Sequence, residues 1–157
     1  MVKTNAVRLI ESEKIKYTIK EYDVDENDLS GVHVAIQLGQ PAEQVFKTLV
    51  LKGEQKGYLV CCIPVAQELD LKKVARATGD KKVEMIPMKD LLAVTGYIRG
   101  GCSPIGMKKK LPTFIDETSE LFDVIAISAG IRGMQILLNP QDLINYIEAQ
   151  PKDLCKQ

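Results

Sequence analysis

The chain has 157 residues, of which 45% are hydrophobic and 27% are charged, proportions that are typical of a globular protein. Its 21 basic and 21 acidic residues give a formal net charge of zero, which argues against a protein that covers a long stretch of nucleic-acid backbone. The balance is compatible with an enzyme that contacts only the end of a nucleic acid, or one that acts on a small molecule.

Signals that direct a protein to a membrane or out of the cell are not evident in the sequence. Residues 1–5 lack the apolar core and the cleavage site of a signal peptide. The longest mostly apolar stretch, residues 58–66, is much shorter than the roughly 18–20 residues that span a bilayer. We therefore expect a cytoplasmic protein without a membrane segment, with free thiols at Cys61, Cys62, Cys102 and Cys155.

The elements expected in the first half of the chain follow from apolar spacing and from helix-capping residues. In chain order they are a helix over residues 5–14, a strand over 17–22, a helix over 32–38, a further helix after Pro41 that carries Ala42 and Val45, and a β-hairpin with strands over 46–51 and 58–63.

The second half is expected to contain more strands than helices. In chain order we predict a helix between Asp70 and Gly79, a strand over residues 82–86, a helix near 90–95, a glycine-rich loop over 96–106, strands over 113–116, 122–128 and 134–138, and a helix that begins at Asn139-Pro140. No repeat or linker divides the chain, so we expect a single domain over residues 1–157. The irregular alternation predicts an α+β fold, with a mixed, largely antiparallel sheet flanked by helices.

The glycine-rich loop, residues 96–106, contains four glycines, a serine and a proline. Glycines allow neighbouring backbone amides to approach a ligand and to point at one carbonyl or phosphate oxygen. The loop lacks the patterns of a P-loop or of a dinucleotide-binding turn, so a tight structural connection explains its composition equally well. Lys108, Lys109 and Lys110 follow it, a run that is typical of a solvated surface but is also able to meet the phosphates of an acceptor end.

Lys47 lies within an apolar strand sequence. Alternation along the strand places Lys47, Leu49 and Leu51 on one face, opposite Phe46 and Val50. A lysine in this setting either extends to solvent at the sheet edge or projects into a pocket, and the sequence leaves both open. In a pocket it is suited to hold a phosphate or to stabilise an oxyanion.

Conventional catalytic groups are scarce. His33 is the only histidine and has no histidine or cysteine cluster beside it, so we expect no metal site. Neither Ser103 nor Cys102 lies in a nucleophile-elbow pattern, which disfavours a catalytic triad. The segment 128–133 is predicted as a turn between two strands, where Ser128 and Gly130 either line a site or only close a hairpin.

Taken together, these segments resemble the YbaK/EbsC family of aminoacyl-tRNA deacylases. Any one segment is a weak signal, but their joint order and spacing cover nearly the whole chain. The segments are Tyr22–Asp25, Val45–Val50, Lys81–Met85, Thr95–Gly106, Ser128–Gly133 and Asn139–Leu143.

The resemblance implies a compact α+β domain whose mixed sheet is curled into a barrel-like shape, similar to the editing domain inserted in bacterial prolyl-tRNA synthetases. It also implies that the chain hydrolyses mischarged aminoacyl-tRNA in trans, with Cys-tRNA(Pro) as the favoured substrate, no cofactor, and prolyl-tRNA synthetase as a partner. Relatives often carry a lysine where Ile131 stands, which implies a weaker tRNA contact at this turn. The expected catalytic residues are Lys47 and Gly101, and the expected substrate-binding residues are Tyr22, Gly100, Ser103, Ser128, Gly130 and Asp142.

For a cysteinyl ester, the resemblance implies that the substrate's own thiolate attacks the carbonyl, so that the enzyme needs only to position an already reactive ester. We expect the backbone of Gly100 and Gly101 to hold the aminoacyl group, and Lys47 to contact the terminal phosphate or the developing negative charge. Three alternatives stay open: a deacylase for Ala-tRNA(Pro) or another small aminoacyl-tRNA, a non-catalytic module that binds tRNA or a synthetase, and a small-molecule hydrolase that uses Ser103 or Cys102.

Overall fold

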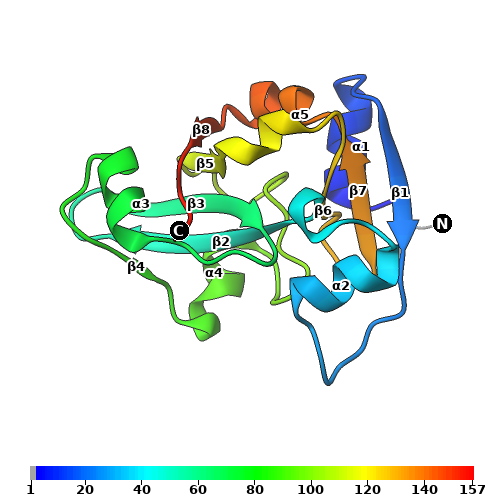
Figure 1. Cartoon of the computed structure of the whole chain (residues 1–157), viewed down its shortest axis with the longest axis horizontal. Coiled ribbons are helices and arrows are strands. Elements are labelled where there is room, and N and C mark those ends of the chain that lie inside the picture. Colours follow the sequence, from blue (N-terminus) through cyan, green and yellow to red (C-terminus); the bar gives the residue numbers. More distant parts are fainter. Residues whose placement is uncertain (1–2) are drawn as a thin grey trace.

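The computed structural model describes residues 3–157, in which the strands form two sheets (Figure 1). Met1 and Val2, part of the segment without signal-peptide features, lie outside the described residues. The first sheet is antiparallel, in the order β1 (Tyr17–Glu21), β7 (Met134–Leu138), β6 (Ile125–Ser128). The second sheet is mixed, in the order β4 (Val83–Met85), β2 (Phe46–Gly53), β3 (Gly57–Pro64), β5 (Thr113–Asp116), β8 (Gln150–Lys152).

The predicted α+β class with mixed, largely antiparallel pairing is confirmed, but the strands do not close into one barrel. β2 pairs antiparallel with β3 and β4, whereas β5 runs parallel to β3 and to β8. The two sheets meet at a single parallel bridge between Val45 and Ala126. This bridge brings the start of β2 next to β6, and the site described below lies at this junction.

Capping residues set the ends of most helices, as the sequence predicted. Asp70 accepts hydrogen bonds from the first backbone amides of its helix, and Gly79 ends that helix in the left-handed conformation. Asn139 and Pro140 likewise begin the last helix. The helices are α1 (Asn5–Ser12), α2 (Gly31–Leu38), α3 (Leu71–Thr78), α4 (Leu91–Thr95) and α5 (Pro140–Ile147), with short 3-10 turns at Ala42–Gln44, Met88–Asp90 and Glu117–Leu121.

The helix predicted after Pro41 is only the 3-10 turn Ala42–Gln44. Val45 is extended, because its carbonyl oxygen accepts the amide of Val65 and its backbone bridges Ala126. The helical spacing of Ala42 and Val45 is therefore overridden by pairing with strands that are distant in the sequence. The short strand β8 was also not predicted, and it lies near α5 in Figure 1.

The two faces of β2 belong to different parts of the core. Phe46 and Val50 face a main cluster that joins both sheets to α1 and α5, whereas Leu51 faces a smaller cluster with α3. The alternation predicted for this strand is thus confirmed. None of the helices between residues 3 and 157 is long and apolar enough to cross a membrane.

Candidate functional site

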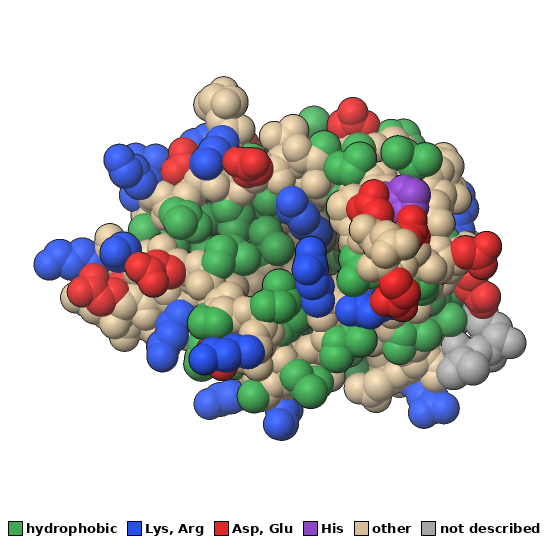
Figure 2. All heavy atoms as spheres, turned by 90° about the horizontal axis from the view of Figure 1, so that it is seen from below, with side chains coloured by type: hydrophobic (Ala, Val, Ile, Leu, Met, Phe, Trp, Pro, Cys, Tyr) green, Lys and Arg blue, Asp and Glu red, His purple; other side chains and the backbone are tan. Residues whose placement is uncertain are grey.

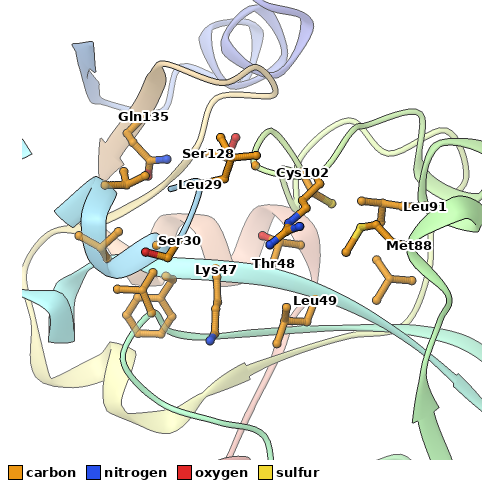
Figure 3. Close-up of a pocket in the computed structure, with 18 of the residues that line it drawn as sticks. Leu29, Ser30, Lys47, Thr48, Leu49, Met88, Leu91, Cys102, Ser128 and Gln135 are labelled. Carbon is orange, nitrogen blue, oxygen red and sulfur yellow. The ribbon is translucent and has the colours of Figure 1, made fainter. Parts of the chain in front are cut away.

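A cavity of about 340 Å³ opens at the junction of the two sheets (Figure 3). It is bounded by β2, by the N-terminal end of α2, by the glycine-rich loop and by the facing strands β6 and β7. Its lining is mainly apolar, and within the described chain it includes no aspartate or glutamate. The polar side chains of the lining are Tyr22, Ser30, Lys47, Thr48, Arg99, Ser128 and Gln135.

One wall of the cavity is an open strand edge. β4 pairs with β2 only from Leu51 to Gly53, and the amide of Ile86 makes one further bond to the carbonyl oxygen of Val50. Because the backbone groups of successive residues point to opposite edges of a strand, the N–H and C=O of Thr48 point to the same edge as those of Val50, away from β3. A ligand in the cavity therefore finds backbone donor and acceptor groups at Thr48.

Lys47 is half-buried on β2 and lines this cavity. Burial lowers its pKa, an effect that the acidic groups of Glu68 and Cys155 partly oppose. In Figure 3 the amine of Lys47 extends away from Ser128, and no carboxylate of the described chain lies within 4.0 Å of it. A partly desolvated lysine without a counter-ion favours an anionic ligand, such as a phosphate.

Arg99 adds a second positive charge that the sequence reasoning missed. It lies in the glycine-rich loop, its side chain is exposed, and it lines the cavity. Its carbonyl oxygen accepts a hydrogen bond of 2.8 Å from Nε of Arg132, which fixes the loop against the turn after β6. The available signal was an arginine beside two glycines, a pattern that suits backbone and guanidinium contacts to one anion.

Gly100 and Gly101 hold the glycine-rich loop against the β6–β7 turn. Gly100 has a φ of +84° and lines the cavity, whereas Gly101 is buried. A Cβ on Gly101 would lie 3.2 Å from backbone atoms of Ile131 and Arg132, so a larger residue would have to displace this backbone by a few tenths of an ångström. The amide of Gly101 donates to the carbonyl oxygen of Ile98 and is therefore occupied within the loop.

Ser128 and Gln135 face each other across β6 and β7, and both line the cavity. Ser128 is 8% exposed, and its hydroxyl oxygen accepts the amide of Gly130 at 3.1 Å. Gln135 is 6% exposed, and its Oε1 has no hydrogen-bond partner among residues 3–157. Sequence reasoning missed Gln135, although a glutamine inside the apolar strand Met134–Leu138 was a visible irregularity.

Tyr22 joins this group, because its amide donates to the carbonyl oxygen of Gly133 and its side chain lines the cavity. Four predicted site residues are not part of the lining, namely Gly101, Ser103, Gly130 and Asp142. Ser103 is fully buried and accepts the amide of Ile105, while Gly130 packs against Tyr97 with a φ of +102°. Asp142 is exposed in the first turn of α5.

Side chains that are able to act as nucleophiles or bases are held inactive or lie elsewhere. Cys102 lines the cavity, but burial raises the pKa of its thiol to about 11. His33 lies on α2 beside Asp25 and Asp28, outside the lining, and is the single purple side chain between acidic groups in Figure 2. The free thiols expected at the four cysteines are confirmed.

The sequence matches the model of the aminoacyl-tRNA editing domain over residues 30–146. It is 51% identical over 148 residues to a protein of Enterococcus faecalis with the assigned name Cys-tRNA(Pro)/Cys-tRNA(Cys) deacylase EbsC, a match that covers 94% of this chain and 90% of the relative. It is also 30% identical over 107 residues to a proline–tRNA ligase of Thermosipho melanesiensis, covering 60% of this chain and 19% of that protein.

Solved structures share the fold at lower sequence identity. A crystal structure described as a trans-editing enzyme for prolyl-tRNA synthetase superposes with a TM-score of 0.82 at 23% identity, over 98% of this chain and 99% of the other. The hypothetical protein APE2540 superposes with a TM-score of 0.86 at 17% identity, over 95% and 97%. The match over residues 30–146 and the identity of 51% show that the chain belongs to the family of aminoacyl-tRNA editing domains.

Proposed function

We propose that this chain is an aminoacyl-tRNA deacylase that removes a wrong amino acid from tRNA in trans, with Cys-tRNA(Pro) as its main substrate. The observation that carries the proposal is a small cavity with Lys47 and Arg99 in its lining and no carboxylate, in a chain of zero net charge. The acceptor end of a charged tRNA offers the matching groups, a phosphate and a small ester. Family membership and the 51% identical relative support the same activity.

The cavity is suited to positioning rather than to nucleophilic attack by the protein. The thiol of Cys102 stays protonated near neutral pH, and the hydroxyl of Ser128 has no histidine or carboxylate beside it in the cavity lining. A cysteinyl ester carries its own nucleophile. Once its thiol has lost a proton to solvent, the sulfur attacks the ester carbonyl, the bond to the ribose oxygen breaks, and that oxygen takes up a proton. Water then opens the resulting thiolactone, which gives free cysteine.

Each site residue has a defined role in this scheme. Lys47 is assigned a phosphate of the acceptor end, because it belongs to the lining and carries a positive charge whose amine extends away from Ser128. Tyr22, Gly100 and Ser128 contact the terminal nucleotide and its aminoacyl group. Gly101 acts through packing, since its amide is occupied, and Ser103 and Gly130 shape the loops around the cavity. Asp142 is given no role, because it is exposed on α5 outside the lining.

Selection of the correct tRNA needs more than this cavity. A chain without net positive charge gains little affinity from the phosphates of a whole tRNA. We infer that a complex with prolyl-tRNA synthetase supplies tRNA(Pro), and that a single domain over residues 1–157 acts there in the cytoplasm. The 30% identity over 107 residues between this chain and a proline–tRNA ligase supports this inference.

The deciding experiment measures release of the amino acid from Cys-tRNA(Pro), Ala-tRNA(Pro) and Pro-tRNA(Pro) by the purified chain. We expect cleavage of the cysteinyl ester only, and no cleavage when the cysteine thiol is methylated. Cleavage of Ala-tRNA(Pro) at a similar rate would replace thiol assistance by direct hydrolysis. If none of the three esters is cleaved, the deacylase proposal is wrong and a tRNA-binding module becomes the better interpretation.

A further inference from the structure

One end of the cavity is apolar and has no role in the scheme above. Its side chains come from β2, β4, α4 and the turn between β4 and α4, and we call it the methionine end. They are Leu49, Met85, Ile86, Met88 and Leu91. Figure 3 shows Met88 and Leu91 together on the side of the cavity away from Ser30 and Gln135. This end therefore offers a ligand a surface of side chains that carry neither a charge nor a hydrogen-bonding group.

Backbone hydrogen bonds hold the methionine end beside the open edge of β2. The amide of Ile86 donates to the carbonyl oxygen of Val50 at 3.2 Å. The amide of Asp90 donates to the carbonyl oxygen of Pro87 at 2.9 Å and closes the turn that carries Met88. The backbone of this wall is thus fixed, whereas its unbranched methionine side chains are able to adapt to a ligand.

Two side chains at this end are strongly exposed for apolar groups. Met85 is 46% exposed and Met88 is 59% exposed, although Leu91 in the same wall is buried. Single exposed apolar side chains are common on protein surfaces, but two in the wall of a ligand cavity gain free energy when an apolar ligand covers them. Methionine sulfur also makes favourable contacts with aromatic rings. The methionine end is therefore suited to a flat aromatic group.

The acceptor end of a charged tRNA carries such a group. Its terminal nucleoside is adenosine, and the phosphate, the aminoacyl ester and the base leave the ribose in three directions. In Figure 3, Lys47, Ser128 and Met88 lie on three different sides of the cavity. Lys47 suits the phosphate and Ser128 the aminoacyl group, which leaves the methionine end for the base. The cavity volume of about 340 Å³ is within the range of sites for small ligands, about 300–1,000 Å³.

We propose that the methionine end binds the adenine base of the terminal nucleoside, with Met85 and Met88 packed against the face of the base. This inference rests on the deacylase function proposed above and names the part of the substrate that this wall recognises. Because every tRNA ends in adenosine, the contact holds the reactive end without depending on the tRNA body. An apolar contact releases no counter-ions, so it suits a chain of zero net charge.

The methyl resonances of methionine report this contact directly in an NMR titration of the isotope-labelled chain. One ligand is adenosine 5′-monophosphate, and the other is ribose 5-phosphate, which lacks the base. We expect the methyl resonances of Met85 and Met88 to move upfield with the nucleotide only, because a base that stacks on a methyl group shields it. Met107 and Met134 lie outside the lining and serve as internal controls. The variants Met85→Leu and Met88→Leu assign the two resonances.

A kinetic comparison tests the same contact during the reaction. One substrate is the cysteinyl ester of adenosine 5′-monophosphate, and in the other a methyl group replaces the base. For two methionine contacts, we expect the wild-type chain to cleave the first with a kcat/KM about 3- to 140-fold higher. In Met88→Ser this ratio should fall about 2- to 12-fold, whereas Met88→Leu keeps the apolar surface and should retain the ratio. Leu121→Ser removes an exposed apolar side chain outside the lining and is the matched control.

Methyl shifts that are absent, equal with both ligands, or confined to Met107 and Met134 would overturn the base contact. Equal wild-type rates on the two small esters would overturn it as well. If neither small ester is cleaved, the methyl resonances alone decide. None of these results affects the deacylase function, which is judged by release of cysteine from Cys-tRNA(Pro). A chain that leaves Cys-tRNA(Pro) intact but shows the Met85 and Met88 shifts would overturn the proposed function and keep the base site.

Discussion

Replacing Lys47 by methionine should separate the activity of this chain from its stability. The side chain is half-buried without a carboxylate within 4.0 Å in residues 3–157, so its removal breaks no ion pair. Methionine keeps the apolar stem that packs on β2, and we expect the free energy of unfolding to change by no more than about 0.5 kcal/mol.

The same change should weaken catalysis clearly. A hydrogen bond to a charged group contributes about 1.5–3 kcal/mol, and 1.4 kcal/mol corresponds to a factor of ten. Loss of one phosphate contact by Lys47→Met therefore predicts a kcat/KM for Cys-tRNA(Pro) that is about 10- to 140-fold lower. Lys72 on α3 is exposed and outside the cavity, and Lys72→Met is the matched control that should leave the rate unchanged.

Salt dependence identifies the group that Lys47 contacts. Each phosphate neutralised on a single strand contributes about −0.7 to the slope of log affinity against log salt concentration. The slope for kcat/KM should become shallower by about this amount in Lys47→Met and stay the same in Lys72→Met. A full wild-type rate in Lys47→Met would refute the reasoning, and a lower kcat with an unchanged slope would place Lys47 at the oxyanion instead.

Three further variants test other parts of the argument. Cys102→Ser should retain a near-wild-type rate on Cys-tRNA(Pro), because the pKa of about 11 keeps the Cys102 thiol protonated, and abolished activity would indicate an enzyme nucleophile. Gly31→Ala gains up to about 1 kcal/mol of helix propensity but brings a Cβ to 2.4 Å from Cγ1 and 2.7 Å from Cβ of Val65, so denaturation in urea should show a net destabilisation. The cost of Gly31→Ala should be smaller in a Val65→Gly background, which removes both atoms. Backbone amides, led by that of Lys56, lower the pKa of Asp80, so its contribution to stability is present above the ordinary value of about 3.9 and is lost as the pH falls through the folded value. Asp80→Asn should therefore flatten the acid limb of a pH–stability curve, and an unchanged limb would contradict this assignment.

Local chemistry explains which elements the sequence predicted well. Asp70 and Gly79 bound α3, and Asn139 with Pro140 begins α5, because capping depends on neighbours within one turn. The division into two sheets depends on pairings such as β3 with β5, which join residues about 50 positions apart. No local pattern encodes such a pairing. Val45 is an example, because its spacing from Ala42 suits a helix but its backbone instead bridges Ala126, which is distant in the sequence.

The candidate site was predictable in part for the same reason. Lys47 was evident as a charge in an apolar strand, and the glycines were evident from their loop. Arg99 and Gln135 became visible only in space, because their importance comes from the cavity that they share with Lys47. For Asp142 the sequence motif suggested a site residue, but the structure places its exposed side chain outside that cavity.

In the proposed mechanism, the absence of an activated nucleophile from the cavity lining gives the site its selectivity. With Cys102 protonated and Ser128 accepting the amide of Gly130, the described lining holds the ester but does not attack it. Attack then depends on a nucleophile that the bound amino acid brings, which cysteine has and alanine or proline lacks. A stronger enzyme nucleophile would raise the rate for every ester that fits, including correctly charged tRNA. Under the proposed mechanism, the lack of an enzyme nucleophile in this cavity therefore protects the correct product, and selectivity follows from the substrate's own side chain.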